Sequence, residues 1–473
     1  MHSTLYADWR ARQSPPSFRE GDGLQPPERL LQAVWFHQRL RREALRAADG
    51  RVVRVLHPGF WNREAGPDFR DAMIQFDRDP PRSGDVEVDV APGGWRGHGH
   101  DRNRNFERVI LHVVWAPGAA ARADLPALAL RDVLDAPLSE LEQWLGSGET
   151  GEWPEWMRGR CSAPLRELPE PVVGELLRQA ARVRLEAKAT ALTARARDAG
   201  WEQALWEGLF AALGYKHNVW PFRRLAELIP SLDGGDSRDA LAWQARLFGL
   251  GGLLPAELPS RGSGGFVKQL WDIWWRERDV YAEIVLPRNI WRLHGLRPAN
   301  HPLRRLALAA HWLARGGLAN QLESWLCADE PPKRKPASLL RLLQVGRDPF
   351  WSWHVALNSA RAPRSQTLLG AARVTDLATN VILPWFFARA GAGRSAAMRE
   401  AVERTYFAWP AGEDNAALKL ARQRLLGARP PHRLESAAAQ QGLLQIVRDF
   451  CKRSNALCEQ CQFPSLVRQL GVG

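Results

Sequence analysis

Lysine is nearly absent from this chain of 473 residues, which has 58 arginines but only 7 lysines, none of them in residues 1–150. Long apolar runs are also missing, because arginine interrupts each one well before the roughly 18 residues that a membrane-spanning helix needs. Cysteine is scarce, and its odd count of five implies no disulfide scaffold. The opening residues 1–16 carry no apolar signal core, so we expect a cytoplasmic protein without a membrane partner.

Several motifs of common enzyme classes are missing as well. No P-loop, G-x-G-x-x-G or G-x-S-x-G occurs in a fitting context, which argues against NTPases, dinucleotide-dependent enzymes and serine hydrolases. Hydrophobic residues make up 45% of the chain and charged residues 25%, which is typical of a globular protein.

The net charge of +13 is distributed unevenly along the chain. Residues 1–150 hold 20 arginines and 22 acidic residues, whereas residues 151–473 hold 45 basic and 30 acidic residues. This asymmetry suggests a metal-binding head on a body that binds a polyanion such as nucleic acid. The alternative is an arginine-rich surface that only keeps the chain soluble.

Hydrophobic periodicity predicts an α+β protein whose two kinds of structure are separated along the chain. Residues 28–45 have the spacing of an amphipathic helix, and the alternation in residues 85–90 is that of a strand, with acids on one face and valines on the other. Further strands are predicted at 51–62, 69–77 and 108–115, whereas helical periodicity dominates after residue 150. We therefore predict an arm at 1–27, a small α/β domain at 28–150 with the order helix, three strands, helix or loop, strand, a helical domain at 151–445, and a cysteine-containing tail at 446–473.

Four acidic residues occupy positions in the front domain where their side chains can converge. Glu28 opens the first helix, Asp68 begins the second strand, and Glu87 and Asp89 lie two apart on the third strand and so point to one face. Converging carboxylates bind Mg²⁺ or Mn²⁺, and such an ion promotes hydrolysis of a phosphodiester bond. The alternative is that Glu87 and Asp89 form only the solvated face of an edge strand.

This pattern resembles the PD-(D/E)xK nuclease superfamily, whose core has the order helix, three strands, helix, strand. The resemblance rests on Glu28 in the helix, Asp68 in G-P-D-F, and Glu87 in V-E-V-D-V. It implies a metal-dependent nuclease fold and a catalytic role for these residues. Asp89 stands where the superfamily has the lysine that orients the attacking water, so it either adds a metal ligand or marks a site that has lost activity.

The sequence H-G-H-D-R-N follows this strand and contains His98 and His100. Two histidines two residues apart on an extended loop point the same way, so they are candidates to bind a metal or to replace the missing lysine as a base. The glycines beside them allow the backbone to approach a ligand closely. His112 lies between apolar residues on the last strand and is interpreted as a core histidine.

Most of the chain is similar to an uncharacterised bacterial family, domain of unknown function 2851. The segments that carry this resemblance include HPGFWNREAGPDFRDAMI, GDVEVDV, GWRGHGHDRN, VILHVVW, LFAALGYKHN, LRPANHPLRRLALAA and FWSWHVAL. The family implies no established activity. Its third strand usually reads V-E-I-H, so this chain departs from its relatives at Asp89.

Three cysteines near the end, Cys451, Cys458 and Cys461, form a C-(x)6-C-(x)2-C run. Thiolates at this spacing suit Zn²⁺ or an iron–sulfur cluster, with a fourth ligand from Cys161, Cys327 or a histidine. The spacing resembles the first three cluster ligands of endonuclease III-like DNA glycosylases, although Val467 stands where their fourth cysteine would be. The alternative is three buried apolar thiols.

Arg297, Arg304 and Arg305 are concentrated beside a proline-punctuated turn and are candidates to bind phosphates of nucleic acid. Together these features predict a metal-dependent nuclease-like protein. The alternatives are a catalytically inactive nucleic-acid-binding or scaffold protein, and a metal-dependent hydrolase of a small molecule.

Overall fold

The computed structural model divides the chain into two compact units. The first unit contains residues 1–187 and 413–473, and the second contains residues 188–412. Placement is described for Tyr6, Arg10, and residues 26–62, 66–118, 122, 124–138, 141, 161–215, 217–232, 238–255, 264–294, 296–427, 434–451 and 461–471.

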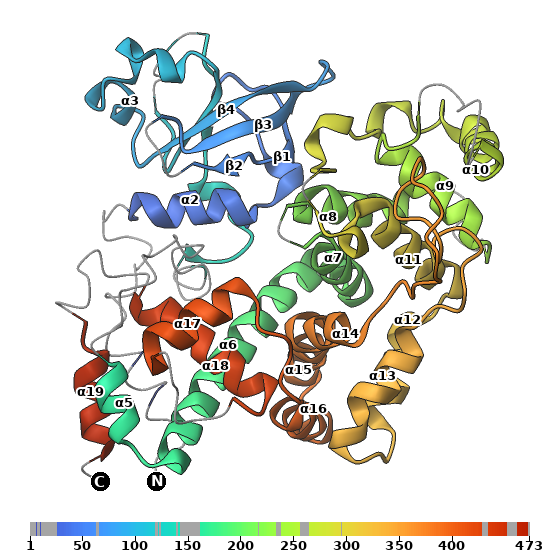
Figure 1. The fold of residues 1–473 in the computed structure, drawn as a ribbon. Coiled ribbons are helices and arrows are strands. Elements are labelled where there is room, and N and C mark those ends of the chain that lie inside the picture. Colours follow the sequence, from blue (N-terminus) through green and yellow to red (C-terminus); the bar gives the residue numbers. More distant parts are fainter. Residues whose placement is uncertain are drawn as a thin grey trace. The chain divides into compact units, whose positions relative to one another are not determined.

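A mixed β-sheet lies near the N-terminus, and helices make up most of the chain after it (Figure 1). The strand order is β1-β3-β4-β5-β6, with the short β2 paired to β3. Strands β1 to β4 pair in antiparallel fashion, whereas β5 and β6 run parallel to β4. The strands are β1 (Val53–His57), β2 (Phe60–Trp61), β3 (Phe69–Phe76), β4 (Arg82–Asp89), β5 (Val109–Val114) and β6 (Ala127–Ala129). The protein is therefore α+β, as the sequence predicts.

The acidic face of β4 is buried. This strand lies in the middle of the sheet between β3 and β5, and Asp85, Glu87 and Asp89 are each at most 6% exposed. The interpretation of these acids as the solvated face of an edge strand is therefore wrong. Asp85 has a structural role, because its Oδ1 accepts a hydrogen bond of 3.0 Å from the backbone amide of Asp71, which adopts a left-handed conformation where the register of β3 shifts.

Helix α2 (Glu28–His37) packs against β4. Its buried face includes Leu30, Leu31, Val34 and Trp35, at the spacing of one helical side. The helix ends earlier than the sequence pattern predicts, because Gln38 adopts a left-handed conformation there. Trp35 also donates an indole hydrogen bond of 2.9 Å to the carbonyl of Pro58, the residue at which the predicted strand 51–62 divides into β1 and β2.

The connection from β4 to β5 is a compact series of short helical turns rather than an extended loop. It contains α3 (Gly94–Gly97) and 3₁₀ turns at His100–Arg102 and Arg104–Phe106. Trp95 and Phe106 from this connection form a small apolar cluster with Val109 and Leu125. This cluster holds the connection in place next to the buried acidic face of β4.

The other long elements described in the first unit are helices. A core of mostly aliphatic side chains is shared by helices from residues 161–187 and from the C-terminal segment. These helices are α5 (Ser162–Glu167), the first part of α6 (Glu170–Ala199), α17 (Ala416–Leu426), α18 (Ala437–Ile446) and α19 (Phe463–Gly471).

The second unit is built from packed helices. The long α6 continues into it, and α7 packs on α8, α9 on α11, and α15 on α16. The helices are α7 (Trp201–Gly214), α8 (Val219–Leu228), α9 (Ala240–Leu250), α10 (Gly264–Glu277), α11 (Pro302–Arg315), α12 (Leu318–Cys327), α13 (Lys335–Leu343), α14 (Ala371–Leu377), α15 (Leu383–Ala392) and α16 (Ala396–Ala408). Within the described residues, every helix is too short or too polar to cross a bilayer.

Candidate metal centre

Three carboxylates meet at the start of α2: Glu28 from α2, Asp68 from the residue before β3, and Glu87 from β4. Gln32 in α2 donates hydrogen bonds to Glu28 Oε1 at 3.0 Å and to Asp68 Oδ1 at 2.9 Å. Asp68 Oδ2 accepts from the amide of Val88 at 3.1 Å, and the amide of Asp68 donates to Glu87 Oε2 at 3.0 Å. The structure thus brings Glu28, Asp68 and Glu87 together through the side-chain amide of Gln32 and the backbone amides of Asp68 and Val88.

The electrostatics of this group favour binding of a cation. Burial raises the pKa of Asp68 to about 7, and the neighbouring Glu28 adds to the rise, whereas hydrogen bonds from Val88 and Gln32 oppose it. Burial also raises the pKa of Glu87 to about 9, with the adjacent Asp68 as the next cause. Because like charges are crowded in a partly dry site, a divalent cation would stabilise the ionised forms.

Asp89 lies at the end of β4 beside a completely buried histidine. His112 is paired with Glu87 across the parallel strands, so its side chain lies on the same face as Glu87 and Asp89. His112 Nε2 is 2.9 Å from Asp89 Oδ2. His112 Nδ1 is buried and has no hydrogen-bond partner among the described residues. The core histidine predicted from the sequence is therefore bonded to a candidate metal ligand.

His98 and His100 approach the same carboxylates from the connection between β4 and β5. His98 Nδ1 lies 3.1 Å from Asp89 Oδ1, and His100 Nε2 lies 3.0 Å from Glu87 Oε1. The His100 nitrogen is oriented so that it makes no hydrogen bond within the described part of the chain. One ligand atom each from Asp89, His98 and His100 lie within 4.8 Å of one another, which makes these residues a candidate metal site.

Two glycines make this convergence possible. A Cβ atom at Gly94 would lie 2.6 Å from Asp89 Oδ1, so only glycine lets the first turn of α3 sit against the carboxylate. Gly99 has a φ of 72°, a left-handed conformation that turns the chain between the two histidines. The rings of His98 and His100 lie with their centroids 5.4 Å apart, so they converge through this turn and not through an extended loop.

Sequence reasoning missed two residues of this site. For Gln32, the only indication in the sequence is that it follows Glu28 by one helical turn and therefore lies on the same side of the helix. For His112, the strand pattern indicates a buried position, but its pairing with the acidic strand depends on the register between β4 and β5. The pairing of His112 is not visible without knowing which strands are neighbours.

The arginines predicted to bind nucleic acid have different environments. Arg297 is exposed, but Arg304 and Arg305 are 2% and 5% exposed. Arg304 donates to the carbonyls of Gln366 and Thr367, and Arg305 donates to the carbonyl of Leu368 and to Asn300 Oδ1. Burial lowers the pKa of Arg305 to about 9. These two guanidinium groups hold a loop against α11, so the structure gives them a role in folding rather than at a phosphate-binding surface.

The predicted cysteine cluster lies mainly outside the described residues. Cys458 is not described, and for Cys451 only the backbone conformation is described. Cys461 packs against the apolar core of the first unit, to which the buried Cys161 also contributes, whereas Cys327 is an exposed residue of the second unit. A Zn²⁺ or iron–sulfur site at Cys451, Cys458 and Cys461 remains a prediction.

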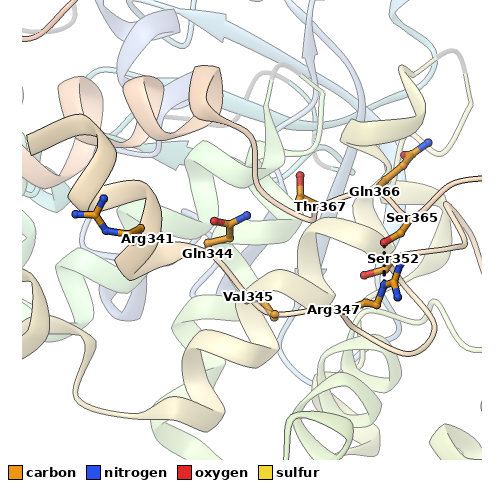
Figure 2. Close-up of a pocket in the computed structure, with 9 residues that line it drawn as sticks. Arg341, Gln344, Val345, Arg347, Ser352, Ser365, Gln366 and Thr367 are labelled. Atoms are coloured by element: carbon orange, nitrogen blue, oxygen red, sulfur yellow. Dashed lines mark hydrogen bonds between the residues drawn. The ribbon is translucent and has the colours of Figure 1, made fainter. Parts of the chain in front are cut away.

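A separate pocket of about 380 Å³ lies in the second unit (Figure 2). Its lining is Arg341, Gln344, Val345, Gly346, Arg347, Ser352, Ser365, Gln366 and Thr367. Arg347 Nε donates to Ser365 Oγ at 3.4 Å, and its guanidinium lies over the ring of Trp353. None of the nine lining residues is acidic, histidine or cysteine, so this pocket has no metal-binding side chains.

Comparison with known proteins identifies a family but no activity. No curated protein and no solved structure matches the chain. The family model "Protein of unknown function (DUF2851)" matches residues 28–415, which include the whole β-sheet and the candidate metal centre. The chain therefore belongs to the DUF2851 family.

Proposed function

We propose that this protein is a metal-dependent hydrolase that cleaves phosphodiester bonds of nucleic acid. The observation that carries the proposal is the contact chain from Glu28 through Gln32 and Asp68 to Glu87. These are the three acidic positions on which the resemblance to the PD-(D/E)xK nucleases rests. The order α2, antiparallel strands β1 to β4, a helical connection and the parallel strand β5 is close to the core expected from that resemblance, with the short β2 as an addition.

The carboxylates have distinct roles in this proposal. Asp68, Glu87 and Asp89 provide oxygen ligands for a divalent ion such as Mg²⁺ or Mn²⁺, which when bound would polarise the phosphate and lower the pKa of a water molecule. The amide of Asp68 donates to Glu87 Oε2, which orients the carboxylate. Glu87 Oε1, which lies 3.0 Å from His100 Nε2, would accept the proton of the attacking water. The water oxygen bonds to phosphorus while the bond from phosphorus to the leaving sugar oxygen breaks, and that oxygen takes up a proton from solvent.

The substrate class follows from charge. The chain carries a net charge of +13, and its excess of basic residues lies after residue 150. A basic protein attracts polyanions, and nucleic acid is the polyanion that contains phosphodiester bonds. Arg304 and Arg305 do not support this step, because both are buried and bonded to protein carbonyl groups.

A cleavage assay tests the proposal. The purified chain would be incubated with single-stranded, duplex and branched DNA and with RNA, in Mg²⁺, Mn²⁺ or EDTA. We expect metal-dependent cutting that is lost in Glu87→Gln and Asp68→Asn and retained in Glu43→Gln, an exposed acid outside the site. Absence of cutting on every substrate would overturn the proposal.

A catalytically inactive nucleic-acid-binding or scaffold protein is the second candidate. It is favoured by Asp89, which stands in the position of the missing lysine and is held by His112. This candidate requires nucleic-acid binding that weakens steeply with salt, without turnover in either metal.

A further inference from the structure

One part of the candidate site contains imidazole nitrogens, from His98 and His100, in addition to a carboxylate. One ligand atom each of Asp89, His98 and His100 lies within 4.8 Å of the other two. Two ligands about 2.1 Å from one ion lie about 3.0 to 3.4 Å apart in octahedral or tetrahedral geometry. The separation of 3.1 Å between Asp89 Oδ1 and His98 Nδ1 falls within that range.

The imidazole nitrogen Nε2 of His100 lies 3.0 Å from Glu87 Oε1 but does not form a hydrogen bond with it. The His100 side chain is only 11% exposed, and its Nε2 makes no hydrogen bond within the described structure. A buried nitrogen that makes no hydrogen bond costs free energy, and coordination to a metal ion removes that cost.

The carboxylate of Asp89 is fixed in position by its surroundings. Its Oδ2 accepts a hydrogen bond from His112 Nε2, which leaves Oδ1 directed toward His98. Gly94 provides space against the same oxygen, since a Cβ there would lie 2.6 Å away. Metal-ligating carboxylates are commonly held by such hydrogen bonds, because the bond sets the direction of the remaining lone pairs.

We propose that Asp89, His98 and His100 bind a divalent transition-metal ion such as Mn²⁺, Fe²⁺ or Zn²⁺ in preference to Mg²⁺, and that His112 is a positioning residue that acts through Asp89. Two imidazoles with one carboxylate are typical of transition metals, whereas Mg²⁺ is held by oxygen ligands and waters. His98 is 55% exposed, so solvent reaches this position. The inference rests on the proposed function for the role of the ion, but binding of the ion is measured without any substrate.

The test uses Mn²⁺ alone, because Mn²⁺ has little affinity for thiolates and so avoids the predicted cysteine site. The full chain would be stripped with EDTA, and free Mn²⁺ would be followed by electron paramagnetic resonance during titration. We expect one tightly bound Mn²⁺ per chain that a 100-fold excess of Mg²⁺ does not displace, whereas any Mn²⁺ held only by the oxygen ligands of Asp68 and Glu87 exchanges with Mg²⁺. Binding should be abolished in His98→Ala and His100→Ala and unchanged in His294→Ala, an exposed histidine of the second unit.

His112 is tested by its effect on affinity and by rescue. We expect His112→Ala to weaken Mn²⁺ binding about 10- to 100-fold, and His112→Gln, whose amide reaches the same oxygen, to recover most of it. A purely structural role predicts equal loss in both variants. Circular dichroism in EDTA establishes that each variant is folded before its affinity is compared.

The possible failures are distinguishable. Displacement of Mn²⁺ by equimolar Mg²⁺, or unchanged binding in both His98→Ala and His100→Ala, overturns this inference even if nucleic acid is cleaved. Tight Mn²⁺ binding by the histidines without cleavage of any substrate overturns the proposed function and supports the inference.

Discussion

His112 Nε2 lies 2.9 Å from Asp89 Oδ2, and both side chains are at most 2% exposed. The two residues come from neighbouring parallel strands, so the register of β4 and β5 places a histidine beside a buried carboxylate. A buried carboxylate requires a partner because water cannot stabilise its charge. Asp89 therefore depends on His112 for stability, whether or not a metal ion is bound.

Removal of His112 should destabilise the first unit. In His112→Ala, Asp89 loses its hydrogen bond in a dry environment, and we expect a loss of about 3 kcal/mol in the free energy of unfolding. Chemical denaturation followed by tryptophan fluorescence measures this loss. In the double variant His112→Leu/Asp89→Leu both polar groups are gone, so stability should recover in part; a double variant as unstable as His112→Ala would contradict the pairing.

Gly94→Ala should damage the site while leaving the sheet intact. The added Cβ would lie 2.6 Å from Asp89 Oδ1, so the carboxylate must turn away from the histidines. We expect Mn²⁺ affinity to fall by about tenfold or more. Gly93→Ala is the matched control, because a Cβ there meets no atom within 4 Å. Equal affinity of the two variants would show that the contact with Gly94 is unimportant.

His57 should make stability depend on pH between about 4 and 6.5. Burial lowers the pKa of His57 in the folded protein to about 4, from an ordinary value of 6.5. As the pH falls below 6.5, His57 binds a proton in the unfolded chain but stays neutral in the folded protein. Its contribution to stability is therefore complete above pH 6.5 and is lost as the pH falls toward 4.

The variant His57→Asn keeps an acceptor for the amide of Gly59, which lies 3.0 Å from His57 Nδ1, but does not titrate. Denaturation at pH 7.0, 5.5 and 4.5 should therefore show a smaller fall in stability for His57→Asn than for the native chain. The same fall in both proteins would assign the pH dependence to other groups. The exposed His294, changed to Asn, serves as the control.

The buried Lys335 should stabilise the second unit through the hydrogen bonds that its ammonium group donates. Its Nζ donates to the carbonyls of Trp325, Leu326 and Ala328, at and just after the end of α12. Lys335→Met leaves these carbonyls without that donor, and we expect a loss of about 2 to 3 kcal/mol. Thermal unfolding measures it, with the exposed Lys333→Met as control; equal melting temperatures would contradict the capping role.

Local patterns in the sequence predicted much of the first unit correctly. Alternation predicted β3 and β4, and the run of apolar residues predicted β5, because each strand follows the period of its own side chains. The helix that begins at Glu28 and the helical character after residue 150 were predicted for the same reason. The sequence did not predict the early end of α2, where Gln38 adopts a left-handed conformation, or the short β6, which is defined by its pairing with β5.

By itself the sequence determined which chemical groups are present and on which strand or turn each one lies. Glu87 and Asp89 share a face because they are two residues apart on a strand, and no tertiary contact is needed for that. Only the tertiary structure decided that this face is buried, that His112 lies beside it, and that Arg304 and Arg305 are internal. The physical reason is that burial and partner choice depend on which strands and loops are neighbours, and that is set by packing across the whole unit rather than by local periodicity.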